Sequence, residues 1–368
     1  MVDVRTIRLA TVGVLLIASI AYKPLSILLA LAMALLPEWA EWLLGLVYGQ
    51  SLAPRVVVTG GYGAGYRRFD GTWFEFYRFE PLEDISTAGV RVIDIIQELL
   101  NRLSLVGVEL GFFKIRLGTQ TLKVLRVGYR SAGDFEAVKP LLTQYFRLEP
   151  LNPGITAQLI GSFEEVPMAW LGLGIILFLI LGTPLKYNWY YGLAALVGFV
   201  LGFLRVRRYL VINRSPVRFR ASVTSSDLLY SNYTNDDAYT YAMSVAQLPA
   251  WGIVITEDPI LRGDLERAYA SFREKAVTRV RGKYEVAAGR YWNTIQRLNT
   301  GERTYRIGIW LEANSEVIPG TRLGTPRNWL SKPWLPALTR DVTVIPIMHG
   351  AQVTSGLQRA VVDIGIDR

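Results

Sequence analysis

Two long apolar runs followed by arginines, within residues 167–208, constrain this chain more than any other stretch. The runs cover 167–183 and 189–204. Each approaches the length that an α-helix needs to cross a bilayer core of about 30 Å at about 1.5 Å per residue. A basic flank follows the second run: Arg205, Arg207, Arg208 and Arg214. We therefore expect a transmembrane hairpin at 167–208, with its basic flank anchored on the cytoplasmic side by anionic lipid.

The N-terminal segment 1–48 holds a second apolar region, which Pro24 divides into the runs 7–22 and 25–47. Because proline costs about 3 kcal/mol inside a helix, Pro24 indicates a turn or a kink. One interpretation is a helical hairpin, and the other is a single span followed by a helix in the membrane interface. A cleaved signal peptide is less favoured, since the apolar stretch is long and no small-residue cleavage site ends it.

Arginine bias favours the hairpin at the N-terminus. Arg5 and Arg8 precede the first apolar run, and the basic flank follows the last one. If both sets lie on the cytoplasmic side, the number of crossings is even. The expected fold class is therefore an α+β membrane protein with four transmembrane helices in two hairpins, a multi-pass protein of the cell membrane with cytoplasmic soluble domains.

A soluble α+β domain is expected at 49–166, between the hairpins. Alternating and aromatic-rich segments indicate strands, and apolar residues at helical spacing indicate helices. The elements follow in this order: strand 72–79, helix 90–103, strands 106–117 and 121–129, helix 134–145 and strand 146–151. This succession predicts a split β-α-β, ferredoxin-like domain.

A second α+β domain, basic and soluble, is expected at 209–368. Its main feature is an apolar stripe between residues 261 and 299 with a mean spacing of about 3.7 residues, the period of a nearly straight helix. We therefore predict one long helix at 261–299. Strands are expected at 304–312 and 342–347, and a polar loop at 225–237.

The charge of the chain is concentrated after the second hairpin. The 368 residues hold 40 Lys and Arg against 31 Asp and Glu, and residues 205–368 contribute +8 of the formal net charge of +9. Such a region suits anionic lipid, nucleic acid or an acidic partner. The cations are mostly arginine, which together with the absence of cysteine favours a heat-adapted source.

No motif for catalysis, metal binding or cofactor binding is recognisable. The chain lacks cysteine and has one histidine, His349, which excludes a cysteine nucleophile and disfavours a histidine triad or a multi-histidine metal site. The glycine-rich stretch 60–65 lacks the Gly-Lys-Ser/Thr ending of a phosphate loop, so we interpret it as a turn. Glu164 and Glu165 are adjacent carboxylates without a histidine beside them and are expected to be solvated.

Arginines in the C-terminal domain are candidates for contacts with anions or nucleic acid. They are Arg218, Arg220, Arg273, Arg279 and Arg281. Carboxylates interleave with the cations of the predicted long helix, which favours an ion-paired, solvated face over a stripe that follows phosphates.

The order of these regions resembles the part of HerA/FtsK-like DNA-translocation ATPases that precedes the motor. The chain is most similar in arrangement to the membrane-bound DNA-transfer ATPases of archaea, relatives of the type IV secretion ATPases. The stretch 261–314, a long helix running into a strand, and the apolar segments 342–347 and 360–366 carry the resemblance. No Walker motif is present, so the resemblance implies a module that works with a separate motor.

Three functions follow as hypotheses. The first is a non-enzymatic membrane platform for a DNA-transfer or secretion machine, which forms a homo-oligomer, contacts membrane lipid and docks a motor ATPase or a pore subunit; contact with nucleic acid is an open question. The second is a membrane-anchored ligand-binding or sensor module whose loop 225–237 lies outside the cell. The third is a structural protein of a viral or cellular envelope.

Overall fold

The computed structural model describes residues 4–60, 64–68, 70–82, 100–183, 188–226, 244–245, 247–279, 282–313 and 321–339. The chain forms two compact units: unit 1 comprises Met1–Val56 and Gly161–Arg214, and unit 2 comprises Val57–Ile160 and Ser215–Arg368. Each unit is thus built from two stretches of sequence. This division differs from the expected one, because the two predicted soluble domains at 49–166 and 209–368 contribute strands to the same unit.

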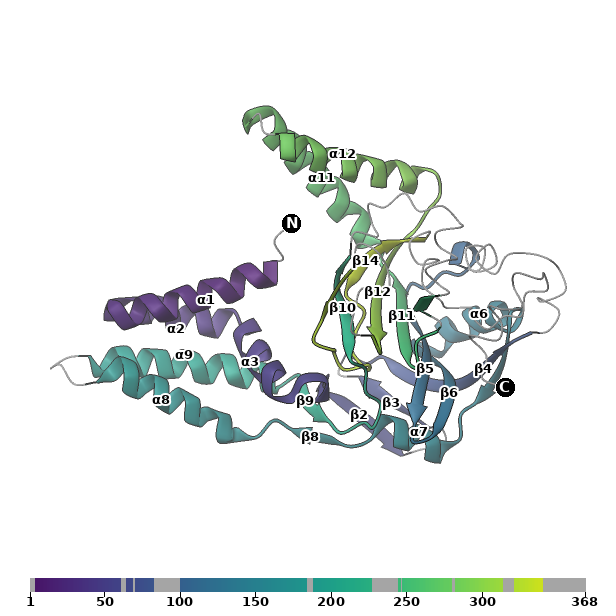
Figure 1. Cartoon of the computed structure of the whole chain (residues 1–368), viewed down its shortest axis with the longest axis horizontal. Coiled ribbons are helices and arrows are strands. Elements are labelled where there is room, and N and C mark those ends of the chain that lie inside the picture. Colours follow the sequence, from purple (N-terminus) through teal and green to yellow (C-terminus); the bar gives the residue numbers. More distant parts are fainter. Residues whose placement is uncertain are drawn as a thin grey trace. The chain divides into compact units, whose positions relative to one another are not determined.

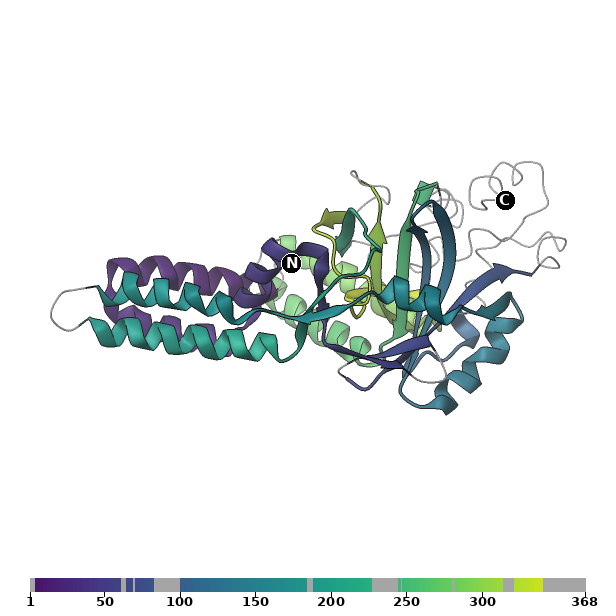
Figure 2. The same ribbon diagram turned by 90° about the horizontal axis from the view of Figure 1, so that it is seen from below.

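Unit 1 consists of helices and one small sheet. Its helices are α1 (Val4–Ala21), α2 (Ser26–Leu35), α3 (Glu38–Tyr48), α8 (Leu171–Gly182) and α9 (Trp189–Arg207). Helices α1, α2, α8 and α9 lie side by side, as both views show (Figures 1 and 2). Strands β1 (Leu52–Pro54), β9 (Leu210–Asn213) and β8 (Phe163–Glu165) form an antiparallel sheet in that order.

The prediction of four transmembrane helices is wrong. Among the described residues, α9 is the one helix that is long and apolar enough to cross a membrane. The pair formed by Lys23–Leu35 and Glu38–Tyr48 would add a second span if its 71° bend lay within one crossing. Helices Ile7–Ala21 and Met168–Gly182 are shorter. The apolar runs overstated the spans because a break after Leu35 separates α2 from α3, and because α8 begins only at Leu171, after a 3-10 turn at Met168–Trp170.

Unit 2 is organised around one large sheet (Figure 1). The strands lie in the order β13-β10-β12-β11-β5-β6-β4-β3-β2, with β14 paired to β12 and β7 to β4. Their bounds are β2 Val56–Gly60, β3 Ala64–Arg68, β4 Trp73–Pro81, β5 Val108–Leu117, β6 Gln120–Tyr129, β7 Phe146–Pro150, β10 Ala221–Ser226, β11 Trp251–Glu257, β12 Thr304–Leu311, β13 Thr321–Gly324 and β14 Leu335–Leu338. The antiparallel pairing of β5 with β11, in which Phe112 faces Ile253, joins the two halves.

The N-terminal half of the sheet has the strand order β7-β4-β6-β5, antiparallel throughout. A split β-α-β arrangement requires this order. Helix α6 (Ala132–Thr143) connects β6 to β7, and Ser131 and Asp134 form a capping box at its start. Most of the predicted helix 90–103 lies outside the described residues, as do the predicted strand 342–347 and most of the loop 225–237.

One face of the sheet carries the main hydrophobic core. Alternate residues of the central strands are buried there, among them Leu110, Phe112, Ile253 and Ile307. Helix α6 covers this face with Phe135, Val138 and Leu142. The alternation follows from the two-residue period of a strand, which sends the intervening residues to the opposite face.

The opposite face buries charged groups among aromatic rings. The Arg126 side chain is fully buried, and its Nη2 lies 2.6 Å from Glu109 Oε1. Arg68 Nη2 lies 3.0 Å from the other oxygen of Glu109. Arg126 Nη1 donates to the carbonyl of Trp329 at 2.8 Å and to Tyr66 Oη at 3.2 Å. Desolvation raises the pKa of Tyr66 to about 12, so the phenol stays neutral beside the two arginines.

The prediction of one long helix at 261–299 is wrong. The segment forms two antiparallel helices, α11 (Ile260–Arg279) and α12 (Gly282–Asn299), which pack against each other as a hairpin (Figure 1). The apolar stripe continues across the break because both helices use it to pack on one another. Phe272 stacks on Tyr291 with ring centroids 5.5 Å apart, and Tyr269 lies 5.4 Å from Trp292.

Replacing Glu109 tests the buried ion network. Glu109→Ala leaves the buried Arg126 without its carboxylate, whereas Arg68 keeps its second partner, Asp70. Removing one partner of a buried pair costs about 3–5 kcal/mol. We expect the free energy of unfolding to fall by that amount, measured by denaturant titration of tryptophan fluorescence in detergent. Glu80→Ala is the control, since Glu80 and its partner Arg78 are exposed, and it should cost less than about 1 kcal/mol. Equal losses in the two variants would contradict the assigned role of the network.

Candidate membrane-binding surface

Helix α9 is apolar on all sides. Its buried stripe consists of Gly192, Ala195, Gly198, Phe199, Gly202, Phe203 and Val206. As far as Leu204, the remaining positions are also apolar or aromatic. Five of them are exposed: Trp189, Tyr190, Leu193, Val197 and Leu201. A helix that is hydrophobic all round belongs inside a protein or a membrane. The exposed face of α9 therefore requires a covering of lipid or protein.

The other helices of unit 1 share this property. Of the exposed large hydrophobic side chains in the described part of the chain, most belong to unit 1 and few to unit 2. Ile17 is 72% exposed on α1, Leu31 54% on α2 and Ile175 56% on α8. Soluble monomers rarely expose a contiguous apolar surface of this extent, which marks a site of interaction with a membrane or a protein.

The two ends of the helical unit differ in chemistry from its middle. At the end where α1 begins and α9 finishes, Arg8 pairs with Glu38 at 2.5 Å and Arg205 Nη1 lies 3.4 Å from the carbonyl of Leu35. At the other end, Lys23 Nζ donates to the carbonyl of Ile180 at 3.0 Å, and Tyr22 is exposed. Cations and aromatic rings at both ends of an apolar surface are typical of membrane interfaces.

Close helix packing in unit 1 depends on glycines of α9. A Cβ atom at Gly198 would lie 2.3 Å from the carbonyl oxygen of Ala30, and one at Gly202 would lie 2.2 Å from that of Met33. The two glycines are four residues apart, the spacing that lets membrane helices approach backbone to backbone. Sequence reasoning missed this contact, although the Gly-x-x-x-Gly pattern inside an apolar run was there to find it.

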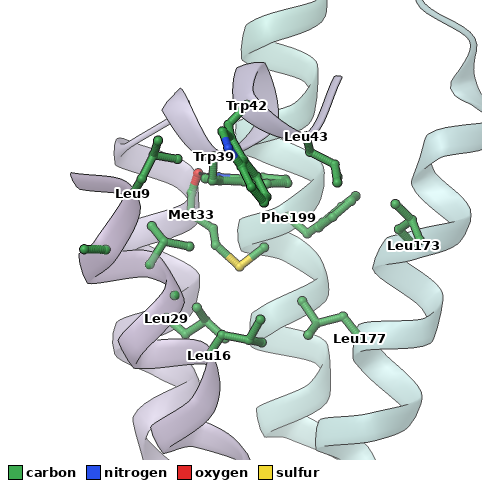
Figure 3. Close-up of a pocket in the computed structure, with 13 residues that line it drawn as sticks. Leu9, Leu16, Leu29, Met33, Trp39, Trp42, Leu43, Leu173, Leu177 and Phe199 are labelled. Atoms are coloured by element: carbon green, nitrogen blue, oxygen red, sulfur yellow. Dashed lines mark hydrogen bonds between the residues drawn. The ribbon is translucent and has the colours of Figure 1, made fainter. Parts of the chain in front are cut away.

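An apolar cavity of about 540 Å³ lies between the helices of unit 1. In Figure 3, Leu9, Leu16, Leu29 and Met33 lie on one side of the cavity, and Leu173 and Leu177 lie on the other. Trp39 forms part of the cavity lining. Its indole N–H donates to the carbonyl of Met33 at 2.8 Å, and the centroid of its ring lies 4.8 Å from that of Phe199. The lining is hydrophobic throughout, so the cavity suits an apolar chain and no polar ligand.

The basic flank is partly neutralised within unit 1. Arg207 pairs with Glu165 at 2.9 Å and donates to the carbonyl of Val166, and Arg214 pairs with Glu164 at 3.1 Å. Glu165 also accepts from Arg55 at 3.1 Å. The two glutamates of β8, which were expected to be solvated, are more than half exposed and are also the counter-ions of the flank. Arg205 and Arg208 remain exposed and without a carboxylate partner among the described residues.

The candidate arginines of unit 2 do not form one cluster of described side chains. Arg218 and Arg220 are exposed near β10, and Arg220 lies 3.9 Å from Glu312. Arg273 is exposed on α11. The Arg279 side chain and Arg281 lie outside the described part of the structure. In that described part, no group of three or more His, Cys, Asp or Glu side chains is placed to hold a metal ion.

Comparison with known proteins does not assign the chain to a family. No protein-family model matches the chain, and no curated protein matches it in sequence. The surface of unit 1 therefore has to be interpreted from its own residues.

The packing of α9 on α2 can be tested at Gly198. Gly198→Ala places a methyl group against the carbonyl of Ala30, and such overpacking costs about 1–3 kcal/mol. We expect a lower thermal midpoint in detergent, measured by circular dichroism. Gly172→Ala in α8 is the control, because its Cβ would meet no atom within 4 Å and alanine favours helix by up to about 1 kcal/mol. If Gly198→Ala were as stable as Gly172→Ala, the close approach would be refuted.

Proposed function

We propose that the chain is a membrane-anchored platform, which holds unit 2 at the cytoplasmic face of the cell membrane for assembly with other proteins. The observation that carries the proposal is the apolar exterior of unit 1, with α9 long enough to cross a membrane. At 19 residues, α9 is about 28 Å long at about 1.5 Å per residue, close to the thickness of a bilayer core.

We infer further that α8 and α9 enter the membrane together, as a pair that starts and ends on the same side. Strand β8 precedes α8 and strand β9 follows α9, and the two strands pair in one sheet. A helical pair whose flanking strands are hydrogen-bonded to each other enters and leaves on the same side. The exposed Arg205 and Arg208 at the end of α9 favour the cytoplasmic side for these strands and for the chain that follows.

The machine served by this platform is proposed to be one for DNA transfer or secretion. Support comes from the resemblance of the chain's arrangement to the region that precedes the motor of HerA/FtsK-like ATPases, and from the absence of a Walker motif in the sequence. In this proposal unit 2 oligomerises and docks a separate motor ATPase or a pore subunit. The large sheet supplies a rigid body for that role.

Cysteine labelling tests the proposed side of unit 2. The chain has no cysteine, so Arg147→Cys on β7, where Arg147 is 69% exposed, gives a single reactive thiol. We expect a membrane-impermeant maleimide to label it only after the cells are permeabilised. Labelling in intact cells would overturn the cytoplasmic placement and favour a sensor module that faces outward. A cysteine engineered into a known external loop of another membrane protein serves as the positive control.

Copy number and nucleotide hydrolysis test the platform itself. We expect the purified chain in detergent to form an oligomer of fixed copy number by light scattering, because a platform for a ring-shaped motor has to match its symmetry. We also expect no ATP hydrolysis above that of the detergent buffer. A monomer at every concentration would contradict the assembly role, and hydrolysis by the purified chain would contradict its dependence on a separate motor.

A further inference from the structure

The hairpin of α11 and α12 extends from the sheet of unit 2 (Figure 1). We call residues 260–272 and 291–299 its base and residues 273–279 and 282–290 its tip. The base packs against the sheet strand β14, since Leu261, Leu265 and Leu298 cluster with Leu338. The aromatic pairs between the two helices also lie at the base or at its border. The base is therefore held by apolar packing and the tip by the partner helix.

Charges in the base are paired. Arg262 lies 3.2 Å from Glu266, and Arg267 lies 2.6 Å from Asp264. Arg297 forms two hydrogen bonds with Glu302, just beyond α12. Each arginine of the base thus has a carboxylate partner, as expected for a solvated helix face.

Charges in the tip are not balanced. Its cations are Arg273, Lys275, Arg279, Lys283 and Arg290, and its carboxylates are Glu274 and Glu285, so the tip has a net charge of +3. Among its described side chains, Arg273, Lys275, Lys283 and Arg290 are exposed and none has a carboxylate partner. The two lysines lie instead over aromatic rings of their own helices, 5.4 Å from Phe272 and 5.2 Å from Tyr284.

Exposed valines accompany these cations. Val277 on α11 is 76% exposed and Val286 on α12 is 59% exposed. Cations mixed with exposed aliphatic side chains suit the interface of an anionic bilayer, where ammonium and guanidinium groups meet phosphates and the aliphatic groups leave water. A surface that follows a nucleic acid backbone gains little from exposed valines, because its contacts are made by cations, polar groups and stacked aromatic rings.

We propose that the tip of the α11–α12 hairpin binds the surface of a bilayer that contains anionic lipid. Phosphate headgroups pair with Arg273, Lys275, Lys283 and Arg290, and Val277 and Val286 enter the interface. The inference rests on the membrane association of the chain and not on its role in a transfer machine. The hairpin is thereby a second membrane contact, electrostatic and reversible, in addition to the apolar helices of unit 1.

The experiment uses the full chain reconstituted in lipid vesicles, with a single environment-sensitive fluorophore attached through Val277→Cys. Two lipid compositions are compared: phosphatidylcholine alone, and phosphatidylcholine with part of it replaced by phosphatidylglycerol. We expect a blue shift of the emission only with the anionic lipid, quenching by lipids that carry a nitroxide near the headgroup, and loss of both at high salt. Ile260→Cys is the matched control, because Ile260 is an aliphatic residue 73% exposed in the base, and its label should not respond.

Charge variants separate the tip from the base. Adding Lys275→Gln and Lys283→Gln to Val277→Cys should abolish the blue shift. Adding Arg262→Gln and Arg267→Gln, which removes the same charge from the base, should leave it intact. Circular dichroism of both variants checks that the helices persist.

Several results would overturn the inference. One is an equal blue shift in neutral and anionic vesicles, and another is an equal response at positions 260 and 277. A third is a response to a double-stranded DNA oligonucleotide in neutral vesicles without any response to anionic lipid, which would assign the tip to nucleic acid. None of these outcomes depends on copy number or ATP hydrolysis, so the proposed platform can fail while this inference stands.

Discussion

The pairing of β5 with β11 is the contact on which the arrangement of the chain depends. These strands come from stretches that lie on either side of α8 and α9 in the sequence, yet they pair antiparallel from Leu110 to Lys114 at the centre of the sheet. The chain must therefore leave the sheet after α7 (Pro153–Ile160), build the helices of unit 1, and return to complete it. Such a pairing has a high loop-closure cost, which buried apolar residues such as Ile253 and Phe112 on one face have to offset.

The sequence pattern predicted secondary structure well where residues that are adjacent in the chain decide it. The strands β4 to β7 and helix α6 fall close to the predicted ranges, because alternation along a strand and a capping residue before a helix are properties of adjacent residues. The long helix failed for a related reason. A stripe at helical period is the same whether the helix continues or folds back on itself, and only the break near Gly282 distinguishes the two. Strand pairing between distant stretches leaves no signal of this kind, so the common sheet was not foreseen.

The membrane-binding surface shows a second limit. Counting apolar residues predicted four spans, but the length of a helix depends on where its backbone hydrogen bonds end, and bends at residues such as Pro37 shorten the helices. Conversely, the spacing of four residues between Gly198 and Gly202 could have predicted their contact with α2. Glu164 and Glu165 were recognised as a pair of carboxylates, but the arginines that they bind are distant in the sequence and could not be identified from it. The burial of Arg126 had no sequence signal at all, since an arginine in a strand is normally solvated.

The distribution of counter-ions separates cations that serve the fold from those that are available to a partner. Arg207, Arg214 and Arg55 are satisfied by the glutamates of β8, and Arg126 and Arg68 share Glu109 in the interior. Both sets would lose their own carboxylates by binding an external anion. The cations of the tip of the α11–α12 hairpin have no carboxylate partner among its described side chains, and its two glutamates offset only part of its positive charge. The net charge of +9 is therefore less informative about partners than the positions of the unpaired cations. The paired arginines of the sheet and the flank contribute to the total charge without attracting a ligand.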